Sequence, residues 1–441
     1  MASVTFVGIL SELVPSGILP QMTDGLSVEE SKVGFLVGVY ALASAIAAIP
    51  LVSATLALNR KMLLMVLLTG FAASNIAVGL SSSYAVIIVF RIVGGICAGV
   101  MWPMIAAYGM RLVPEQMHGK AITGIMEEVS KGVQFIRTHI DVCDPSLTGL
   151  KAMLEIREQL KDNVTIQIVA FPQEGMYAYK GGDEMVEEAL KMGADCVGSI
   201  PHFEWAREIG EKSIHRTVEL AVKYNKLIDV HCDETDDVMS RFVELLNALV
   251  MSEGIGTRTA ASHTCSFGSA DNAYAFRMMS LFQQSGLNFI ALPTENAYLQ
   301  GRQDTYPKRR GLTRVKEFWE SGINVCFGQD SINDPWYPAG NGNLMNILDN
   351  GIHLAQTMSF DELDRCLDLI TTNGAKTLNV EDQYGIEVGK PANFLVLDAD
   401  SPFEAVRQRA DVLASIRHGE YLFKRPDPSF EIALDLFSKT K

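Results

Sequence analysis

The sequence predicts an α/β protein: an incomplete (β/α)₈ barrel, preceded by a four-helix transmembrane segment and followed by a small C-terminal β appendage. Three observations lead to this prediction. Long uncharged stretches fill the first 122 residues, short β-branched runs alternate with helical patterns after about residue 134, and turn-rich strand patterns return after residue 380. We therefore expect three parts, residues 1–122, 123–380 and 381–441.

Charge separates the first part from the rest of the chain. The net charge is −15, but residues 1–122 carry six basic and five acidic side chains, so residues 123–441 carry −16. Basic runs with interleaved aromatic residues are absent, which argues against a nucleic-acid partner. The seven cysteines are scattered without CxxC spacing, which is typical of buried thiols in a reducing compartment.

The first part has the length and composition of membrane-spanning helices. Residues 33–59, 62–90 and 92–110 contain almost no charge, and a helix needs about 20 apolar residues to cross a bilayer. We predict spans at about 2–22, 33–55, 62–80 and 84–109. The short basic loops follow the second and fourth spans, so the rest of the chain is expected in the cytoplasm.

Seven short runs in the second part predict β-strands, and helical patterns separate them. The runs cover residues 135–141, 165–171, 196–201, 227–232, 259–264, 288–293 and 324–330. Such alternation predicts a parallel sheet with crossover helices, and the spacing predicts a (β/α)₈ barrel that lacks one unit. Helices at about 342–356 and 359–378 and strand patterns at 384–400 and 412–425 complete the chain.

Polar side chains gather where these strands end. Gln173, His202, His231 with Glu234, His263 and Asp330 all follow or close a predicted strand. Reactive groups of such barrels project from the carboxyl ends of the strands. A single strand-end histidine is more often structural, but three of them, followed by Asp330, indicate a metal-dependent site.

Long motifs around these residues resemble the cytosine deaminase branch of the amidohydrolase superfamily, over about residues 132–441. The matching stretches include "RTHIDV", "IVAFPQEG", "IPHFE", "IDVHCDE", "LQGRQDTYPKRRG" and "GINVCFGQD". The resemblance implies a TIM-like amidohydrolase barrel that deaminates cytosine or a related amino-heterocycle by hydrolysis. It also implies one divalent metal, iron or zinc, bound by His231 and Asp330.

The same resemblance implies roles for the other site residues. Glu234 would be the general acid and base, and His263 would orient the attacking hydroxide, with Asp330 completing the catalytic set. Gln173 would bind the pyrimidine ring and Trp336 would form a wall of the pocket. Ser331 stands where the family has a second aspartate, and the smaller side chain favours a 5-substituted cytosine.

One part of the family pattern has no counterpart in this chain. The family's first barrel strand carries a His-x-His pair, whose imidazoles face the same way and bind the metal. No two of the eight histidines here are two residues apart. We therefore predict weak metal binding, unless His139 or His202 substitutes, and little deaminase activity. The strands at 135–141 and 324–330 would then be unpaired edges.

The first part resembles the first four helices of a major facilitator superfamily transporter. The resemblance rests on "SELVPSGILPQM", "RIVGGICAG" and "RLVPEQMHGKAI", in which Gly94, Gly95 and Gly99 would allow close helix packing. Such transporters need about twelve spans, so transport by this chain alone is not expected.

Three interpretations of the whole chain remain open. It is a truncated deaminase joined to a membrane segment, or a membrane transporter fragment with a non-catalytic heterocycle-binding domain. The third is an artificial fusion of two neighbouring genes, and in that case the deaminase part is cytoplasmic. The expected partners are a small pyrimidine or similar heterocycle and, through residues 1–122, the membrane. Whether the chain forms a homo-oligomer also stays open.

Overall fold

The computed structural model describes residues 18–26, 28–55, 60–334 and 336–426. It divides the chain into two compact units, of which the first ends at Met117 and the second begins at His118. Helix α5, Tyr84–Ser130, is a single helix of 47 residues and continues through the predicted boundary at residue 122. The three predicted parts and their boundaries stay predictions.

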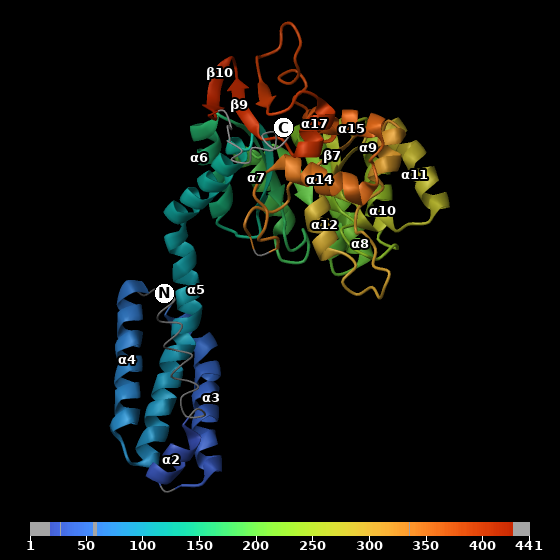
Figure 1. Ribbon diagram of the computed structural model, residues 1–441. Coiled ribbons are helices and arrows are strands. Elements are labelled where there is room, and N and C mark those ends of the chain that lie inside the picture. Colours follow the sequence, from blue (N-terminus) through green and yellow to red (C-terminus); the bar gives the residue numbers. More distant parts are fainter. Residues whose placement is uncertain (1–17, 27, 56–59, 335, 427–441) are drawn as a thin grey trace, which may run out of the picture. The chain divides into compact units, whose positions relative to one another are not determined.

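The first unit is helical. It contains α2 (Leu19–Leu26), α3 (Glu30–Ala54), α4 (Arg60–Leu80) and the first part of α5 (Figure 1). The predicted spans at 33–55, 62–80 and 84–109 fall on α3, α4 and α5, whereas most of the span at 2–22 lies outside the described residues. Within the described residues, Tyr84–Met101 alone is long and apolar enough to cross a membrane, and Met65–Leu80 is a shorter apolar stretch.

Small residues bring α3 and α5 into close contact. A Cβ atom added at Gly95 would lie 2.4 Å from the carbonyl oxygen of Tyr40, and one at Gly99 would lie 2.3 Å from that of Ser44. Neither position therefore has room for a side chain. This is the close approach of helix backbones that small residues allow in lipid.

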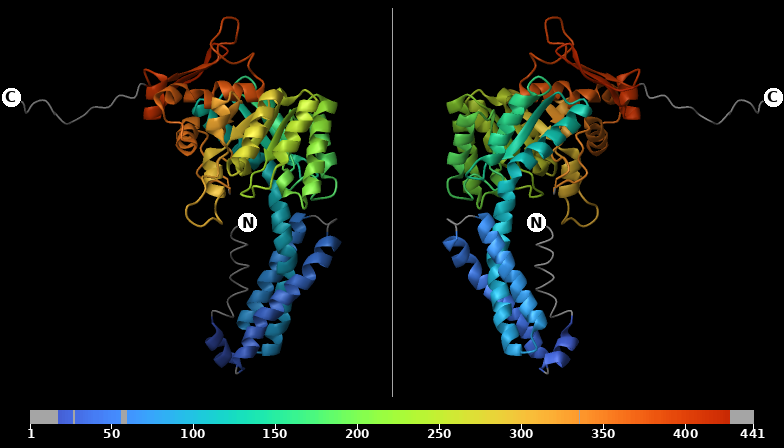
Figure 2. Two further views of the ribbon diagram at one scale, coloured as in Figure 1. Left: turned by 90° about the vertical axis from the view of Figure 1, so that its right-hand side faces the viewer. Right: turned by 90° about the vertical axis from the view of Figure 1, so that its left-hand side faces the viewer.

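The second unit is built on a seven-stranded parallel sheet, with helices on its outer side (Figure 2). The strand order follows the chain, from β1 to β7. The strands are β1 Phe135–Asp141, β2 Thr165–Phe171, β3 Cys196–Ser199, β4 Leu227–Cys232, β5 Thr259–His263, β6 Asn288–Ala291 and β7 Val325–Phe327. Each lies in a run predicted from the sequence, which confirms the incomplete barrel.

Helices connect the strands and follow the last of them. They are α6 Thr148–Leu160, α7 Gly182–Met192, η1 Pro201–Phe203, α8 Arg207–Tyr224, α9 Phe242–Ser252, η2 Gly256–Arg258, α10 Cys265–Gly268, α11 Asn272–Ser285, α12 Pro293–Leu299, α13 Val315–Glu320, α14 Leu344–Ala355, α15 Phe360–Arg365, η3 Cys366–Ile370 and α16 Thr372–Leu378. A core of phenylalanines packs between sheet and helices, with Phe289 and Phe318 rings 4.4 Å apart.

The sheet does not close. Within the described chain, no strand pairs with the outer edge of β1 or of β7. The unpaired edges predicted at these two strands are therefore present. Closure of a barrel requires every strand edge to find a partner.

A small antiparallel sheet completes the second unit and confirms the predicted appendage. It contains β8 (Phe394–Leu397), β9 (Val412–Arg417) and β10 (Glu420–Lys424), in the order β10-β9-β8, with α17 (Pro402–Gln408) between β8 and β9. The Gln134 side chain donates to the carbonyl oxygen of Ile416 at 2.8 Å, and Arg417 donates to the Thr165 hydroxyl at 2.8 Å. These bonds fix the appendage beside the start of β1 and β2.

Candidate metal and active site

Strands β4, β5 and β7 bring three metal-binding side chains together. His231 lies in β4, His263 closes the neighbouring β5, and Asp330 follows β7. One donor atom from each lies within 4.8 Å of the other two. The structure thus brings together the two ligands predicted from the sequence and adds His263 as a third donor.

His263 is oriented by its Nδ1 atom. This nitrogen lies 3.1 Å from Oε1 of Glu234 and 2.9 Å from the side-chain amide of Asn296. The opposite nitrogen, Nε2, is buried, lies 3.9 Å from Oδ2 of Asp330, and has no hydrogen-bond partner among the described residues. A carboxylate at one ring nitrogen favours the tautomer that leaves the other free to bind a metal. His263 therefore has the orientation of a ligand.

The electrostatics of the three donors complement one another. Burial and the neighbouring imidazoles keep the pKa of His231 well below its usual value, so its ring is neutral. Burial lowers the pKa of His263, but Glu234 and Asp330 outweigh this effect and raise it to about 9. The proton on His263 thus balances two carboxylates, which is a task that a bound cation can take over.

This donor set fits a divalent metal. Catalytic zinc sites have three protein ligands and leave one position for water. Two imidazoles and one carboxylate suit zinc and iron alike. The donors therefore agree with the metal that the sequence predicts, without selecting between the two.

Among the described residues, neither of the two histidines named as substitutes belongs to the cluster of His231, His263 and Asp330. Nε2 of His139 lies 3.5 Å from Oδ1 of the fully buried Asp229, and the other carboxylate oxygen, Oδ2, accepts from Arg137 Nη1 at 3.0 Å. His139 is thus turned to this carboxylate, although its ring lies 4.6 Å from that of His231. Both ring nitrogens of His202 are buried and have no hydrogen-bond partner in the described part of the chain.

Two residues that the sequence reasoning missed hold the site in place. Asp233 has a left-handed backbone (φ 57°), and its carboxylate accepts from the Phe242 and Val243 N–H groups, both at 2.9 Å. It thereby fixes the loop that carries Glu234. The same two bonds satisfy the first N–H groups of α9, which begins at Phe242. Asn296, the other missed residue, binds His263 from α12.

Of the remaining predicted residues, Ser331 is buried, Gln173 is half-buried and Trp336 is exposed. Gln173 follows β2 in a loop anchored by Glu204, which accepts from the Met176 N–H at 2.6 Å. Ser331 is buried directly after Asp330, whereas the Trp336 side chain is 54% exposed. The binding roles of Gln173, Ser331 and Trp336 stay predictions.

A buried carboxyl group from α12 is a further missed feature. Glu295 is 1% exposed, and neither of its carboxyl oxygens has a hydrogen-bond partner among the described residues. Burial and the nearby carboxylates of Asp330 and Asp334 raise its pKa to about 8. The group is therefore neutral at physiological pH. Its position on a short helix gave no sequence signal.

Comparison with known proteins agrees with both resemblances. Residues 103–423 match the model of the amidohydrolase family, and residues 1–127 match that of the major facilitator superfamily. N-isopropylammelide isopropyl amidohydrolase of Pseudomonas sp. (strain ADP) is 30% identical over 298 residues, which cover 67% of this chain and 70% of that protein. A chloramphenicol efflux pump of Mycobacterium tuberculosis is 32% identical over 125 residues, only 30% of its length.

Solved structures support the same assignment. The crystal structure of 5-methylcytosine deaminase from Klebsiella pneumoniae, liganded with phosphonocytosine, is 48% identical with a TM-score of 0.72. The match covers 74% of this chain and 81% of that one. The N-terminal match indicates a membrane segment. The rest of the chain is similar to hydrolases that act on C–N bonds. By sequence and by fold, this chain belongs to the amidohydrolase family.

Proposed function

We propose that the chain binds one divalent metal through His231, His263 and Asp330 and deaminates cytosine or a 5-substituted cytosine by hydrolysis. The observation that carries the proposal is the convergence of these three donor atoms within 4.8 Å. Glu234 lies beside them, because its carboxylate contacts the Nδ1 atom of His263 at 3.1 Å. Metal donors and a proton carrier therefore share one strand-end rim.

The residues of this site have distinct tasks in the proposed reaction. A divalent metal at this donor set supplies a water that is ionised near neutral pH. Burial raises the pKa of Glu234, but His263 more than offsets this effect and the net shift is downward, so Glu234 is ionised and able to accept a proton. It passes this first proton of the water to the ring nitrogen, and it then carries the second proton of the same water to the amino group, which leaves as the C–N bond breaks. Oxygen from water replaces nitrogen on the ring, and ammonia leaves.

Ser331 and the solved relatives support a preference for a ring with a substituent at position 5. Structures of the deaminase from Klebsiella pneumoniae, which is named for 5-methylcytosine, were obtained with phosphonocytosine and with 5-fluorocytosine. In this chain the buried Ser331 directly follows Asp330. A serine is shorter than the aspartate of the family pattern and leaves room for a methyl group.

A second candidate function is heterocycle binding without turnover. It is favoured by the donor set, which offers three protein ligands where the family resemblance implies four. In either case we infer that residues 1–122 anchor the chain in a membrane with the barrel in the cytoplasm. The transporter-like match and the apolar stretch Tyr84–Met101 support this inference.

Metal analysis of the full chain in detergent tests the donor set. We expect about one Zn²⁺ or Co²⁺ per chain. His263→Ala should weaken metal binding by at least about 100-fold, because loss of a group that only supports a ligand already lowers metal affinity by about 10–100-fold, and loss of a ligand should lower it more. The exposed His215→Ala is the matched control and should bind like the wild type. Unchanged affinity in His263→Ala would disprove the three-residue site. Ammonia release from 5-methylcytosine then separates the two candidate functions, since bound metal without ammonia supports the second.

The substituent preference is tested at Ser331. Ser331→Asp restores a longer, charged side chain, so we expect kcat/KM for 5-methylcytosine to fall about tenfold relative to cytosine, the usual effect of one methyl group in a pocket. Ser331→Ala keeps the space and should keep the preference. An unchanged ratio in Ser331→Asp would remove this part of the proposal.

A further inference from the structure

A large cavity begins at the metal donor set and crosses the layer of the sheet. Its volume is about 740 Å³. Its inner wall includes Asp229, His231 and Asp330, which face the inside of the barrel. Its outer wall consists of helix residues, among them Gly124 of α5 and Gly374 of α16. A cavity with walls inside the barrel and in the outer helices must pass through the sheet.

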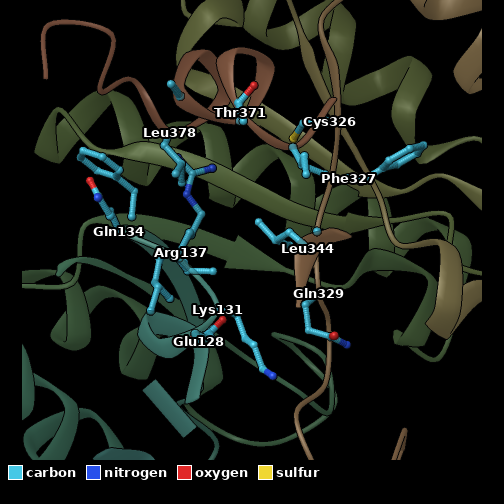
Figure 3. A pocket seen from close by; sticks show the side chains of 18 of the residues that line it. Glu128, Lys131, Gln134, Arg137, Cys326, Phe327, Gln329, Leu344, Thr371 and Leu378 are labelled. Carbon is cyan, nitrogen blue, oxygen red and sulfur yellow. The ribbon is translucent and has the colours of Figure 1, made fainter. Parts of the chain in front are cut away.

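The passage lies between the two open edges of the sheet. Residues 134–139, which include most of β1, line the cavity without interruption, and so do residues 326–330 at the end of β7. Successive residues of a strand point to opposite faces, so an uninterrupted run marks a strand edge and not one face. Figure 3 shows Arg137 of β1 and Leu344, Cys326 and Phe327 around this space.

The two ends of the cavity differ in chemistry. The inner end holds the carboxylates and imidazoles of the site. The middle part, between β1 and β7, is polar, and its polar groups are hydrogen-bonded to one another, because Arg137 donates to Asp229, Gln167 and the Thr377 carbonyl, each at 3.0 Å. The outer end is mostly apolar, with walls that include Ile125, Met153, Leu344, Leu367, Ile370 and Leu378, and the side chains of Glu128 and Lys131 also line it. A ligand that fills both ends has a polar head and an apolar body.

The size of the cavity exceeds what one pyrimidine ring fills. Pockets of about 300–1,000 Å³ bury drug-sized ligands. Protein interiors are otherwise packed as densely as organic crystals, so a ligand that reaches the apolar end of this cavity gains contacts there.

We propose that this site takes an amino-heterocycle that carries a long apolar substituent. The ring lies at the metal donor set, and the substituent passes between β1 and β7 to reach α5 and α16. This inference rests on the proposed function and names a substrate class for the same site.

Two glycines allow the outer end to be filled without disturbing the fold. A Cβ atom added at Gly124 in α5 or at Gly374 in α16 meets no atom within 4 Å, and both residues line the cavity. Leucine also has a higher helix propensity than glycine. Gly124→Leu and Gly374→Leu should therefore fold and occupy the apolar end. Gly34→Leu in α3 is the matched control, because its Cβ is equally free and the residue does not line the cavity.

The experiment is calorimetric titration of the metal-loaded full chain in detergent with cytosine and its 5-methyl, 5-propyl and 5-butyl derivatives, corrected for partition into empty micelles. We expect affinity to rise about fourfold per methylene, the usual gain for burying one such group. Both cavity-filling variants should bind cytosine like the wild type and lose the gain for the propyl and butyl derivatives. Gly34→Leu should keep that gain.

The outcomes separate this inference from the proposed function. If cytosine binds and substituent length has no effect, the inference is overturned and the proposed function stands. A gain that persists in both cavity-filling variants, or vanishes in Gly34→Leu, also overturns it. Length-dependent binding that both variants abolish supports the inference, even if none of the ligands releases ammonia and the proposed function fails. If no member of the series binds, both proposals fall.

Discussion

Large apolar side chains at the surface of α3 contrast with the buried phenylalanine core of the barrel unit. In α3 of the first unit, Phe35 is 56% and Ile46 is 66% exposed, whereas Phe289 and Phe318 of the barrel unit are fully buried. The barrel excludes water from its own core. The helical unit buries some apolar side chains, such as Leu36 and Phe71, and exposes others, as expected for helices whose surroundings are apolar. Hydrophobic residues alone therefore do not tell which unit folds around a core.

Buried arginines show the same contrast. Arg91 in α5 donates to the carbonyl oxygen of Leu36 at 3.2 Å and lies 4.4 Å from the ring centre of Tyr40. Arg137 in β1 is held by the buried carboxylate of Asp229 at 3.0 Å. Arg91 thus contacts a backbone carbonyl and an aromatic face, whereas Arg137 belongs to a charged network beneath the site.

The largest difference in stability between the two units is expected when a phenylalanine ring is removed from each. Phe318→Ala should destabilise the barrel unit by about 3–5 kcal/mol, because it leaves a cavity in a packed core. Phe35→Ala, the matched change on the exposed side of α3, should alter stability by less than about 0.5 kcal/mol. Denaturant unfolding of the full chain in detergent measures both. Equal losses would show that the two units do not differ in this way.

Close helix packing in the first unit gives the next largest effect. Gly99→Ala places a methyl group where a Cβ would lie 2.3 Å from the carbonyl oxygen of Ser44, so α3 and α5 must separate. We expect a loss of about 1–3 kcal/mol, typical of overpacking. In Gly79→Ala the added Cβ meets no atom within 4 Å, and this control should not lose stability. Thermal unfolding followed by circular dichroism measures the effect, and similar midpoints for both variants would contradict it.

The smallest effect is a pH dependence of the stability of the barrel unit. The pKa of Glu295 is raised to about 8 in the folded chain, above the usual value near 4.3 that the unfolded chain retains. Between these values the folded state holds a proton that the unfolded state has lost, so this group's contribution to stability falls as pH rises through that window. Glu295→Gln should remove the decline and gain roughly 1–2 kcal/mol at pH 8.

Glu253→Gln is the control for this titration, because Glu253 is exposed after α9. Unfolding midpoints at pH 5, 6.5 and 8 are the measurement. A gain for Glu295→Gln that is the same at all three values would mean that ionisation of this carboxyl group is not responsible.

Much of the candidate site could be predicted from the sequence, for a local reason. The spacing of apolar residues along the chain predicts strands and helices. Because parallel strands of a barrel end at one rim, His231 and Asp330 were expected to meet. His263 as a third donor was not predicted, because its role depends on Glu234 and Asn296, which contact its Nδ1 atom from the loop after β4 and from α12. The bonds from Asp233 that fix the start of α9 span nine and ten residues, so no local pattern indicated this role either.

The sequence by itself determined the parallel strand order, the apolar character of the N-terminal helices and the family, because these follow from periodicity, composition and motifs along the chain. Only the tertiary structure decided which nitrogen of His263 is free, that Glu295 is buried without a partner, and that a cavity passes between β1 and β7. Each of these depends on side chains that are distant in sequence and meet only after the sheet has curved, so no local pattern records them.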